Sequence, residues 1–335
     1  MPGVVILEPR KVLTVICHSP TIPNDRSLVN RVWNGKYQAQ IMATHRFGGS
    51  WTELKLSALR DYLVQYQKIF TTNPYAKKLR TIYVDAFAGT GDRDTGEDLR
   101  QASLFGYNED TRGYQEGSVK VALSLEHKFH QYIFIDNKAK HASALHNLVE
   151  LEFPGLADRC TIEKTDANSW LQKWCRTQAW REQRAVVFLD PYGMDVEWDT
   201  IAAIADTKAI DLWVLFPLGI GPSRVLPNQE VPDSKWANRL TKLFGTDDWK
   251  SQFYRADGDT DLFGVNRESV TKIAGVDKIL AFFLKRLNSV FEKTVEHPLI
   301  LLNSKNSPMY ALCFAAGNPR GAPTAVKISA HLVRG

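Results

Sequence analysis

The sequence predicts an α/β fold in which a mostly parallel, doubly wound sheet ends in an antiparallel hairpin. Short runs of β-branched and aromatic residues alternate with segments whose apolar residues recur at helical spacing, which is typical of parallel strands joined by helices. The first run, 81–84, leads directly into a glycine-rich turn. The last two runs, 299–302 and 310–314, are separated only by a short polar segment, as in a hairpin.

The composition is that of an ordinary globular protein. The chain has 335 residues, of which 44% are hydrophobic and 24% charged, and 42 Lys and Arg against 37 Asp and Glu give a net charge of +5. This mildly basic balance permits a nucleic-acid partner without requiring one. The 4 cysteines form no Cys-x-x-Cys pair, which argues against a cysteine metal site and suits a reducing cytoplasm. No apolar run approaches the roughly 20 residues of a membrane helix.

The first 44 residues lack the periodicity of the rest, and we hypothesise that they are an extension preceding a domain at 45–335, with translation beginning at Met42. A peripheral N-terminal arm of the native protein is the alternative. From Trp51 to Phe70 apolar residues recur at helical spacing, so we expect a helix there. Lys55 and Arg60 fall among its polar positions. We expect both side chains on the solvated face.

The first predicted strand carries the first candidate site. Thr81-Ile-Tyr-Val has the composition of a strand buried on both faces, and Asp85 follows at its carboxyl end. Gly89 and Gly91 allow a sharp turn and a close approach of the backbone to a ligand. Ligands bind at this edge of open α/β sheets, so the turn indicates a nucleotide-type cofactor site. An ordinary strand-to-helix turn is the alternative.

A polar insertion at 92–117 delays the next helix, for which Ser118 is the expected N-cap. The second strand, Tyr132-Ile-Phe-Ile-Asp136, again ends in an acid. In dinucleotide folds an acid about 20 residues beyond the glycine turn holds the ribose hydroxyls. Asp136 lies at that distance only when the count begins at Ser118.

Three further strands are predicted, and acids follow two of them. Asp166 ends the third strand and Asp190 the fourth, so four acids are expected at one edge of the sheet, which suggests a polar cleft. The expected strands are 160–166, 184–190 and 210–217. The expected helices that precede each of them are 138–153, 167–180 and 198–205.

The alternation of strands and helices is interrupted at 219–276 by a proline-containing insertion, which we expect to lie over the cleft and to contain a short helix at 236–244. A helix at 279–290 follows, then the hairpin and a closing helix from about Ala322.

The tetrapeptide Asp190-Pro-Tyr-Gly193 is the second candidate site. Pro191 stiffens the loop, Asp190 can accept a hydrogen bond from an amino group, and Tyr192 can stack on a base, a contact worth roughly 1–3 kcal/mol. This set suits an exocyclic amino group such as that of adenine, unpaired or flipped out of a stack. A stiff strand-to-helix connection capped by Asp190 is equally compatible with these residues.

Taken together, several segments resemble the three-Cys-motif partner proteins (TcmP), within the S-adenosylmethionine-dependent methyltransferases, over about residues 45–334. The segments that carry the resemblance are Phe47-Gly-Gly-Ser-Trp-Thr-Glu-Leu-Lys-Leu56, Tyr83-Val-Asp-Ala-Phe-Ala-Gly-Thr-Gly91, Gly117-Ser118, Phe134-Ile-Asp136, Leu189-Asp-Pro-Tyr-Gly193, Asp211-Leu-Trp-Val-Leu-Phe-Pro217 and Asn303-Ser-Lys-Asn-Ser-Pro-Met-Tyr310. The resemblance implies a Rossmann-like methyltransferase sheet.

The resemblance also implies roles for individual residues. Asp190 and Tyr192 would face the substrate. The remaining positions would bind S-adenosylmethionine, with Asp85, Phe87, Gly89 and Gly91 at the methionine end, Asp136 at the ribose and Asp166 with Ala167 at the adenine. Gly117 and Ser118 would also be cofactor-binding residues. The tetrapeptide resembles the Asp-Pro-Pro-Tyr of enzymes that methylate adenine's amino group. Here Tyr192 and Gly193 replace the proline and the final aromatic residue, so the stacking ring is displaced by one position.

Two functional hypotheses follow. The first is a methyltransferase that uses S-adenosylmethionine on an amino group, with nucleic acid as a candidate substrate. The second is an auxiliary partner of a three-cysteine-motif protein that is similar to radical enzymes using S-adenosylmethionine. For the partner role, the 92–117 and 219–276 insertions would be contact surfaces. A nicotinamide dehydrogenase fits less well, because Gly91 is followed by a loop instead of opening a helix.

Overall fold

The computed structural model describes residues 51–90, 117–191, 193–257, 269–303 and 305–333. Its strands form an 8-stranded sheet of order β3-β2-β1-β4-β5-β10-β8, in which β9 also pairs with β10, and a separate 2-stranded sheet of β6 and β7. The strands of the large sheet are β1 (Arg80–Asp85), β2 (Gln131–Asp136), β3 (Cys160–Lys164), β4 (Gln183–Leu189), β5 (Ile210–Pro217), β8 (Lys293–Thr294), β9 (Leu299–Leu302) and β10 (Pro308–Ala316). Those of the small sheet are β6 (Tyr254–Asp257) and β7 (Ser269–Lys272).

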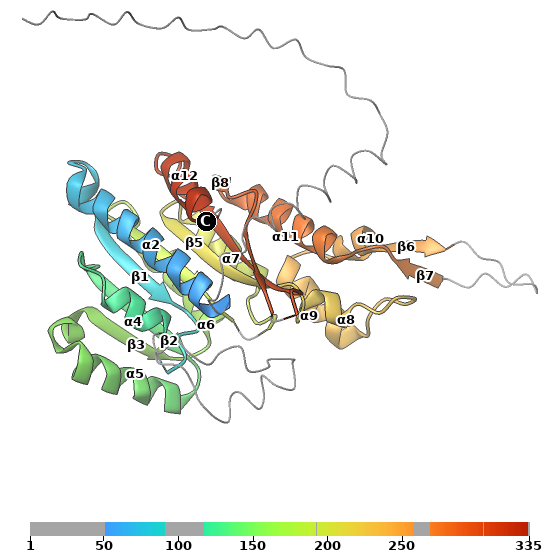
Figure 1. The fold of residues 1–335 in the computed structure, drawn as a ribbon, viewed down its shortest axis with the longest axis horizontal. Helices are drawn as coiled ribbons and strands as arrows, with labels where there is room; N and C mark the ends of the chain where they lie inside the picture. Colours follow the sequence, from blue (N-terminus) through green and yellow to red (C-terminus); the bar gives the residue numbers. More distant parts are fainter. Residues whose placement is uncertain (1–50, 91–116, 192, 258–268, 304, 334–335) are drawn as a thin grey trace, which may run out of the picture. The chain divides into compact units, whose positions relative to one another are not determined.

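The described α-helices are α2 (Trp51–Thr72), α4 (Ser118–Leu123), α5 (Ala139–Glu152), α6 (Ala167–Thr177), α7 (Trp198–Asp206), α8 (Pro222–Val225), α9 (Ser234–Phe244), α10 (Trp249–Phe253), α11 (Val276–Val290) and α12 (Ala322–Leu332). Two 3₁₀ turns, η1 (Ala76–Lys78) and η2 (Pro154–Arg159), precede β1 and β3. Figure 1 shows how these elements are arranged around the sheet.

The predicted fold class is confirmed. β1 pairs in parallel with β2 and β4, β2 with β3, and β4 with β5, whereas β10 runs antiparallel to β5 and to β9. This is the Rossmann-like order 3-2-1-4-5, with the sixth position taken by an antiparallel strand. The sequence patterns missed β6, β7, β8 and the short helices α8 and α10. These elements have too few residues to show a period.

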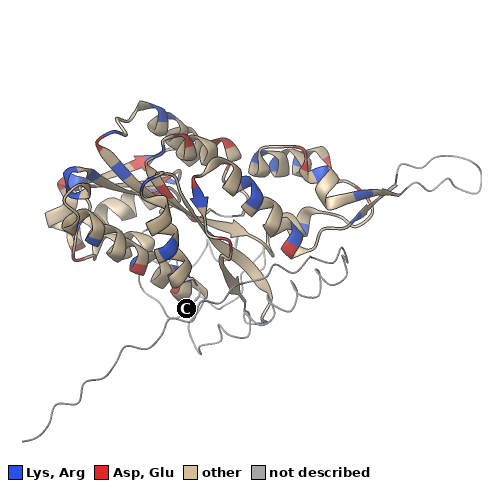
Figure 2. Cartoon of the chain, turned by 90° about the horizontal axis from the view of Figure 1, so that it is seen from above, with Lys and Arg blue, Asp and Glu red and all other residues tan. Residues whose placement is uncertain are grey.

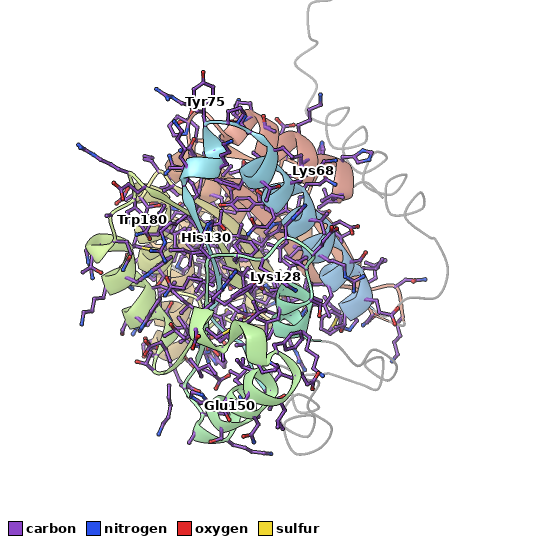
Figure 3. All side chains as sticks on the ribbon, turned by 90° about the vertical axis from the view of Figure 1, so that its left-hand side faces the viewer. Lys68, Tyr75, Lys128, His130, Glu150 and Trp180 are labelled. Atoms are coloured by element: carbon purple, nitrogen blue, oxygen red, sulfur yellow. The ribbon has the colours of Figure 1, made fainter. Side chains whose placement is uncertain are left out.

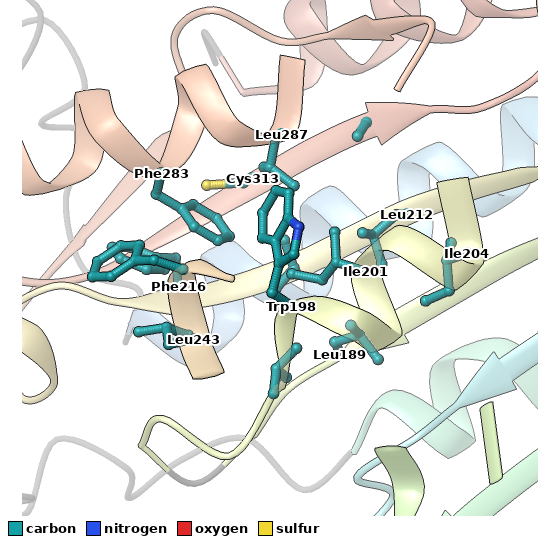
Figure 4. Close-up of a cluster of buried hydrophobic side chains, with 14 of the residues drawn as sticks. Leu189, Trp198, Ile201, Ile204, Leu212, Phe216, Leu243, Phe283, Leu287 and Cys313 are labelled. Carbon is teal, nitrogen blue, oxygen red and sulfur yellow. The ribbon is translucent and has the colours of Figure 1, made fainter. Parts of the chain in front are cut away.

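The alternation of side chains along the strands builds two cores, one on each face of the sheet. On β4, Val187 and Leu189 belong to one core, and Val186 and Phe188 to the other. Helices α6, α7, α9 and α11 contribute to the core of Val187, part of which Figure 4 shows around Trp198. Helices α2, α4, α5 and α12 contribute to the core of Phe188. The sheet is therefore covered on both faces.

The 219–276 segment shares the core of the main domain. Its buried apolar residues pack in the same cluster as α7 and α11, and they include Leu240, Leu243, Phe244, Trp249 and Phe253. The small β6–β7 sheet extends from this segment beyond the end of α10 (Figure 1). The expectation that the segment covers the cleft stays a prediction.

The amino end of β1 is fastened at Thr81. Its backbone N–H donates to Nδ1 of His130 at 3.0 Å, and its hydroxyl oxygen accepts a hydrogen bond of 3.1 Å from Nε2 of Gln67 on α2. His130 is labelled in Figure 3. The Gln67 bond ties β1 to α2 and the His130 bond ties it to the start of β2, both at the end of β1 opposite to Asp85.

Gly245, which ends α9, allows a close contact with α7. Its φ of +67° is left-handed, and a Cβ added there would lie 2.0 Å from Cδ1 of Trp198. We expect Gly245→Ala to lower the free energy of unfolding by about 2 kcal/mol, because the methyl group adds backbone strain and displaces the indole. Urea denaturation measures the change. In the control Gly155→Ala, no atom lies within 4 Å of the new Cβ, and a comparable loss there would contradict this explanation.

Candidate functional site at the carboxyl edge of the sheet

The candidate site lies where the strand order reverses. β1 connects to β2 on one side, and β4 lies on its other side, so β1 and β4 flank the topological switch point at which open α/β sheets bind ligands. Asp85 is the last residue of β1, and Asp190 directly follows β4. Tyr83 and Phe188 face the core of α2, and residues two positions further along a strand face the same side. The pleat therefore directs both carboxylates toward α2.

Asp85 is fully buried. The Tyr83 hydroxyl donates to its Oδ2 at a long oxygen–oxygen distance of 3.4 Å, and its Oδ1 has no hydrogen-bond partner among the described residues. Burial raises the pKa of Asp85 from 3.8 to about 7. A hydrogen bond from Ser118 and the charge of Lys55 oppose the rise, and the negative charge of Asp190 adds to it. An unpaired buried carboxyl oxygen is costly, so this atom marks a place for a donor or a cation.

Lys55 of α2 pairs with Asp190. Its Nζ donates to Oδ2 of Asp190, and the two side chains are only 8% and 23% exposed. The rings of Trp51 and Phe188 flank the ammonium, with centroids 5.4 and 6.0 Å from Nζ. The expected place of Lys55 on the solvated face is therefore wrong. It lies one turn after Trp51 on the buried side of α2, and a lysine at the start of an amphipathic helix gave no signal of this contact.

Asp136 stabilises the glycine turn through a hydrogen bond. Its Oδ2 accepts the Gly89 N–H at 3.1 Å and contacts Nδ1 of His141 at 2.9 Å, and its Oδ1 accepts the Lys138 N–H at 2.8 Å. Gly89 has a left-handed φ of +61°, which its lack of a Cβ makes accessible. The side chain of Asp136 is 9% exposed. Since each carboxylate oxygen has two lone pairs, Oδ1 keeps capacity for one more donor.

Asp166 is the N-cap of α6. Its Oδ1 accepts the Ser169 N–H at 2.8 Å, which leaves its other oxygen at the exposed start of the helix, and Ala167 is buried beside it. The next residue, Asn168, ties α6 to the segment that follows Asp190. Its amide donates to the Asp195 carbonyl oxygen at 2.8 Å and accepts the Glu197 N–H at 3.0 Å. The Asn168 side chain thus holds the start of α6 against residues 195–197.

The other candidate residues are placed as follows. Phe87 is partly buried and packs against the core of α6 and α7. Ser118 is the first residue of α4, and the N-cap is Gly117, so the predicted N-cap role of Ser118 is wrong. Gly91 and Tyr192 lie outside the described residues.

Two searches gave negative results within the described ranges. No group of three or more His, Cys, Asp or Glu side chains there could hold a metal ion. None of the described helices combines the length and the apolar character needed to cross a bilayer.

Comparisons with known proteins give similarities to solved structures only. No protein-family model matches the chain, and no curated protein matches it. A DUF519 protein from Legionella pneumophila is 12% identical, with a TM-score of 0.43 over 85% of this chain and 92% of that chain. A putative methyltransferase from Escherichia coli is 14% identical, with a TM-score of 0.27 over 64% and 83%. The glycopeptide N-methyltransferase MtfA, solved with S-adenosylmethionine, is 10% identical, with a TM-score of 0.30 over 81% and 95%.

Proposed function

We propose that the chain binds S-adenosylmethionine at the carboxyl ends of β1, β2 and β3 and transfers its methyl group to an amino nitrogen held by Asp190. The observation that carries this proposal is the meeting of Asp85 and Asp190 at the switch point, one with an unpaired buried oxygen and the other fixed by Lys55. The first suits a charged cofactor and the second a hydrogen-bonding substrate.

The residues fit the parts of this cofactor. Oδ1 of Asp85 has no hydrogen-bond partner among the described residues and suits the positive charge of the methionine end. Oδ1 of Asp136 can accept one ribose hydroxyl in addition to the Lys138 N–H. The free oxygen of Asp166 can accept the adenine amino group without giving up its cap to Ser169. Each contact uses a lone pair that the described contacts leave available.

The chain's own part in the reaction is to orient the acceptor. S-adenosylmethionine, when bound, supplies an activated methyl group. Oδ1 of Asp190 accepts an N–H of the acceptor and fixes the direction of the nitrogen lone pair, while Lys55 keeps the carboxylate from turning. The proton that leaves the methylated nitrogen passes to solvent beside Asp190, whose side chain is 23% exposed.

The auxiliary role beside a three-cysteine-motif protein stays a prediction, as does a nucleic-acid substrate. For nucleic acid, Figure 2 shows basic and acidic positions interspersed along the described elements. For a partner, the β6–β7 sheet is separate from the main sheet and offers its own edges.

Calorimetric titration with S-adenosylmethionine tests the proposal, with NAD as the ligand control. We expect Asp136→Ala to weaken binding about tenfold or more, because a hydrogen bond to a charged group is worth about 1.5–3 kcal/mol. Asp158→Ala is the matched control, since Asp158 is exposed in η2 at the amino end of β3. If the wild-type chain binds NAD instead, or binds neither ligand, the proposal fails.

A further inference from the structure

The charges around Asp190 bear on which amines the site accepts. Among the described residues, the ammonium of Lys55 is the one hydrogen-bonding partner of the Asp190 carboxylate. It engages Oδ2 and leaves Oδ1 to accept from a ligand. The Lys55–Asp190 pair as a whole therefore carries no net charge, while Oδ1 of Asp190 can still accept a hydrogen bond.

We propose, on the basis of the proposed function, that the amine that receives the methyl group is a neutral aryl amine, such as a nucleobase amino group. We also propose that Lys55 is the positioning residue that sets this preference. A neutral amine donates one N–H to Oδ1 and keeps its lone pair for the methyl group. An alkylammonium has no lone pair until it loses a proton.

A cationic acceptor would also meet a second positive charge. Its nitrogen on Oδ1 would lie on the same carboxylate as Nζ of Lys55, and like charges at that separation repel. The rings of Trp51 and Phe188 and the low exposure of Lys55 exclude much of the water that would screen this repulsion. The cofactor's own positive charge adds to the effect, and Asp85 is the acid placed to offset that charge.

The burial of the pair also indicates positioning. Taking a lysine and an aspartate out of water costs several kcal/mol per ion, and such pairs add little net stability compared with apolar residues of the same size. Lys55 and Asp190 are 135 residues apart in the chain, so the pair depends on the assembled fold. Its consequence at the site is one fixed carboxylate orientation and a neutral charge balance.

Ligand-observed NMR on the complex with S-adenosylhomocysteine tests this, since that ligand occupies the cofactor region and no methyl group is transferred. The probes are adenosine and cytidine as aryl amines, and spermidine and Nα-acetyl-lysine amide as alkylammonium ions. For the wild-type chain we expect at least tenfold tighter binding of one aryl amine than of either cation. Lys55→Met leaves Asp190 uncompensated, so this ratio should fall at least tenfold, whereas Lys55→Arg should keep it within threefold.

The inference is overturned if the cations bind as tightly as the aryl amines, if no probe binds, or if Lys55→Met leaves the ratio unchanged. Should Lys55→Met not fold, the wild-type ratio and the Lys55→Arg variant still decide. Failure of S-adenosylmethionine to bind in calorimetry refutes the proposed function. A bound cofactor combined with a preference for alkylammonium ions refutes only this inference.

Discussion

Replacing Asp190 with alanine is expected to abolish methyl transfer and to lower the free energy of unfolding by about 3 kcal/mol, because it leaves the ammonium of Lys55 buried without its partner. The value lies at the low end for buried pairs since Asp190 is 23% exposed. Urea denaturation gives the stability, and calorimetry shows whether cofactor binding survives, as we expect it to.

A double variant separates the two effects. Lys55→Met with Asp190→Leu removes both charges and keeps similar volumes, so stability should return to within about 1 kcal/mol of the wild type. Methyl transfer should stay absent, because leucine at position 190 cannot accept a hydrogen bond from the amine substrate. Transfer that persists in Asp190→Ala removes this residue from the mechanism. A double variant as unstable as the single one shows that packing, instead of the unpaired charge, caused the loss.

The second large effect that we expect is a dependence of stability on pH, caused by two buried aspartates, Asp85 and Asp211. Burial raises the pKa of each from 3.8 to about 7, and the Tyr62 hydroxyl, which donates to Asp211 at 2.7 Å, counteracts the rise only in part. The folded chain therefore holds protons that the unfolded chain has lost above pH 4. As far as these two groups determine it, stability should be highest below about pH 4, fall as the pH rises from there toward 7, and level off above that value.

Asp85→Asn and Asp211→Asn should each flatten this dependence. Each is expected to raise the free energy of unfolding at pH 8, by at most about 4 kcal/mol, since the shift from 3.8 to about 7 corresponds to that energy. Denaturation between pH 5 and pH 8 measures it. If both variants show the wild-type slope, the two carboxyl groups do not hold the extra protons.

The two variants should differ in ligand binding. Asp85 lies at the carboxyl edge, whereas Asp211 pairs in register with Val186, short of the end of β4. Asp85→Asn should weaken S-adenosylmethionine binding about tenfold, because a neutral amide loses the charge attraction, and Asp211→Asn should leave it unchanged. The wild-type affinity should rise between pH 6 and pH 8 as Asp85 ionises. Equal weakening by both variants would indicate a general effect of the substitutions.

Much of the fold was predictable because its main strands are fully buried and have a clear composition. β1, β2, β4 and β5 lie within a residue or two of the expected ranges, and the closing hairpin of β9 and β10 is present. The segment 219–276 was harder, because α8, α10, β6 and β7 are too short to show a period. Its membership in the main core comes from contacts with α7 and α11.

The sequence by itself determined which acids follow the parallel strands, and therefore that Asp85, Asp136, Asp166 and Asp190 meet at one edge. Strand direction and a period of two residues are local properties, and they are enough for this conclusion. Only the tertiary structure decided what those acids contact. The ion pair of Lys55 with Asp190 and the hydrogen bond from Gly89 to Asp136 each join segments far apart in the chain. Oδ1 of Asp85 is buried without a partner among the described residues, which also depends on how distant segments pack around it. Their charge states depend on burial by those distant segments, which no local pattern in the sequence records.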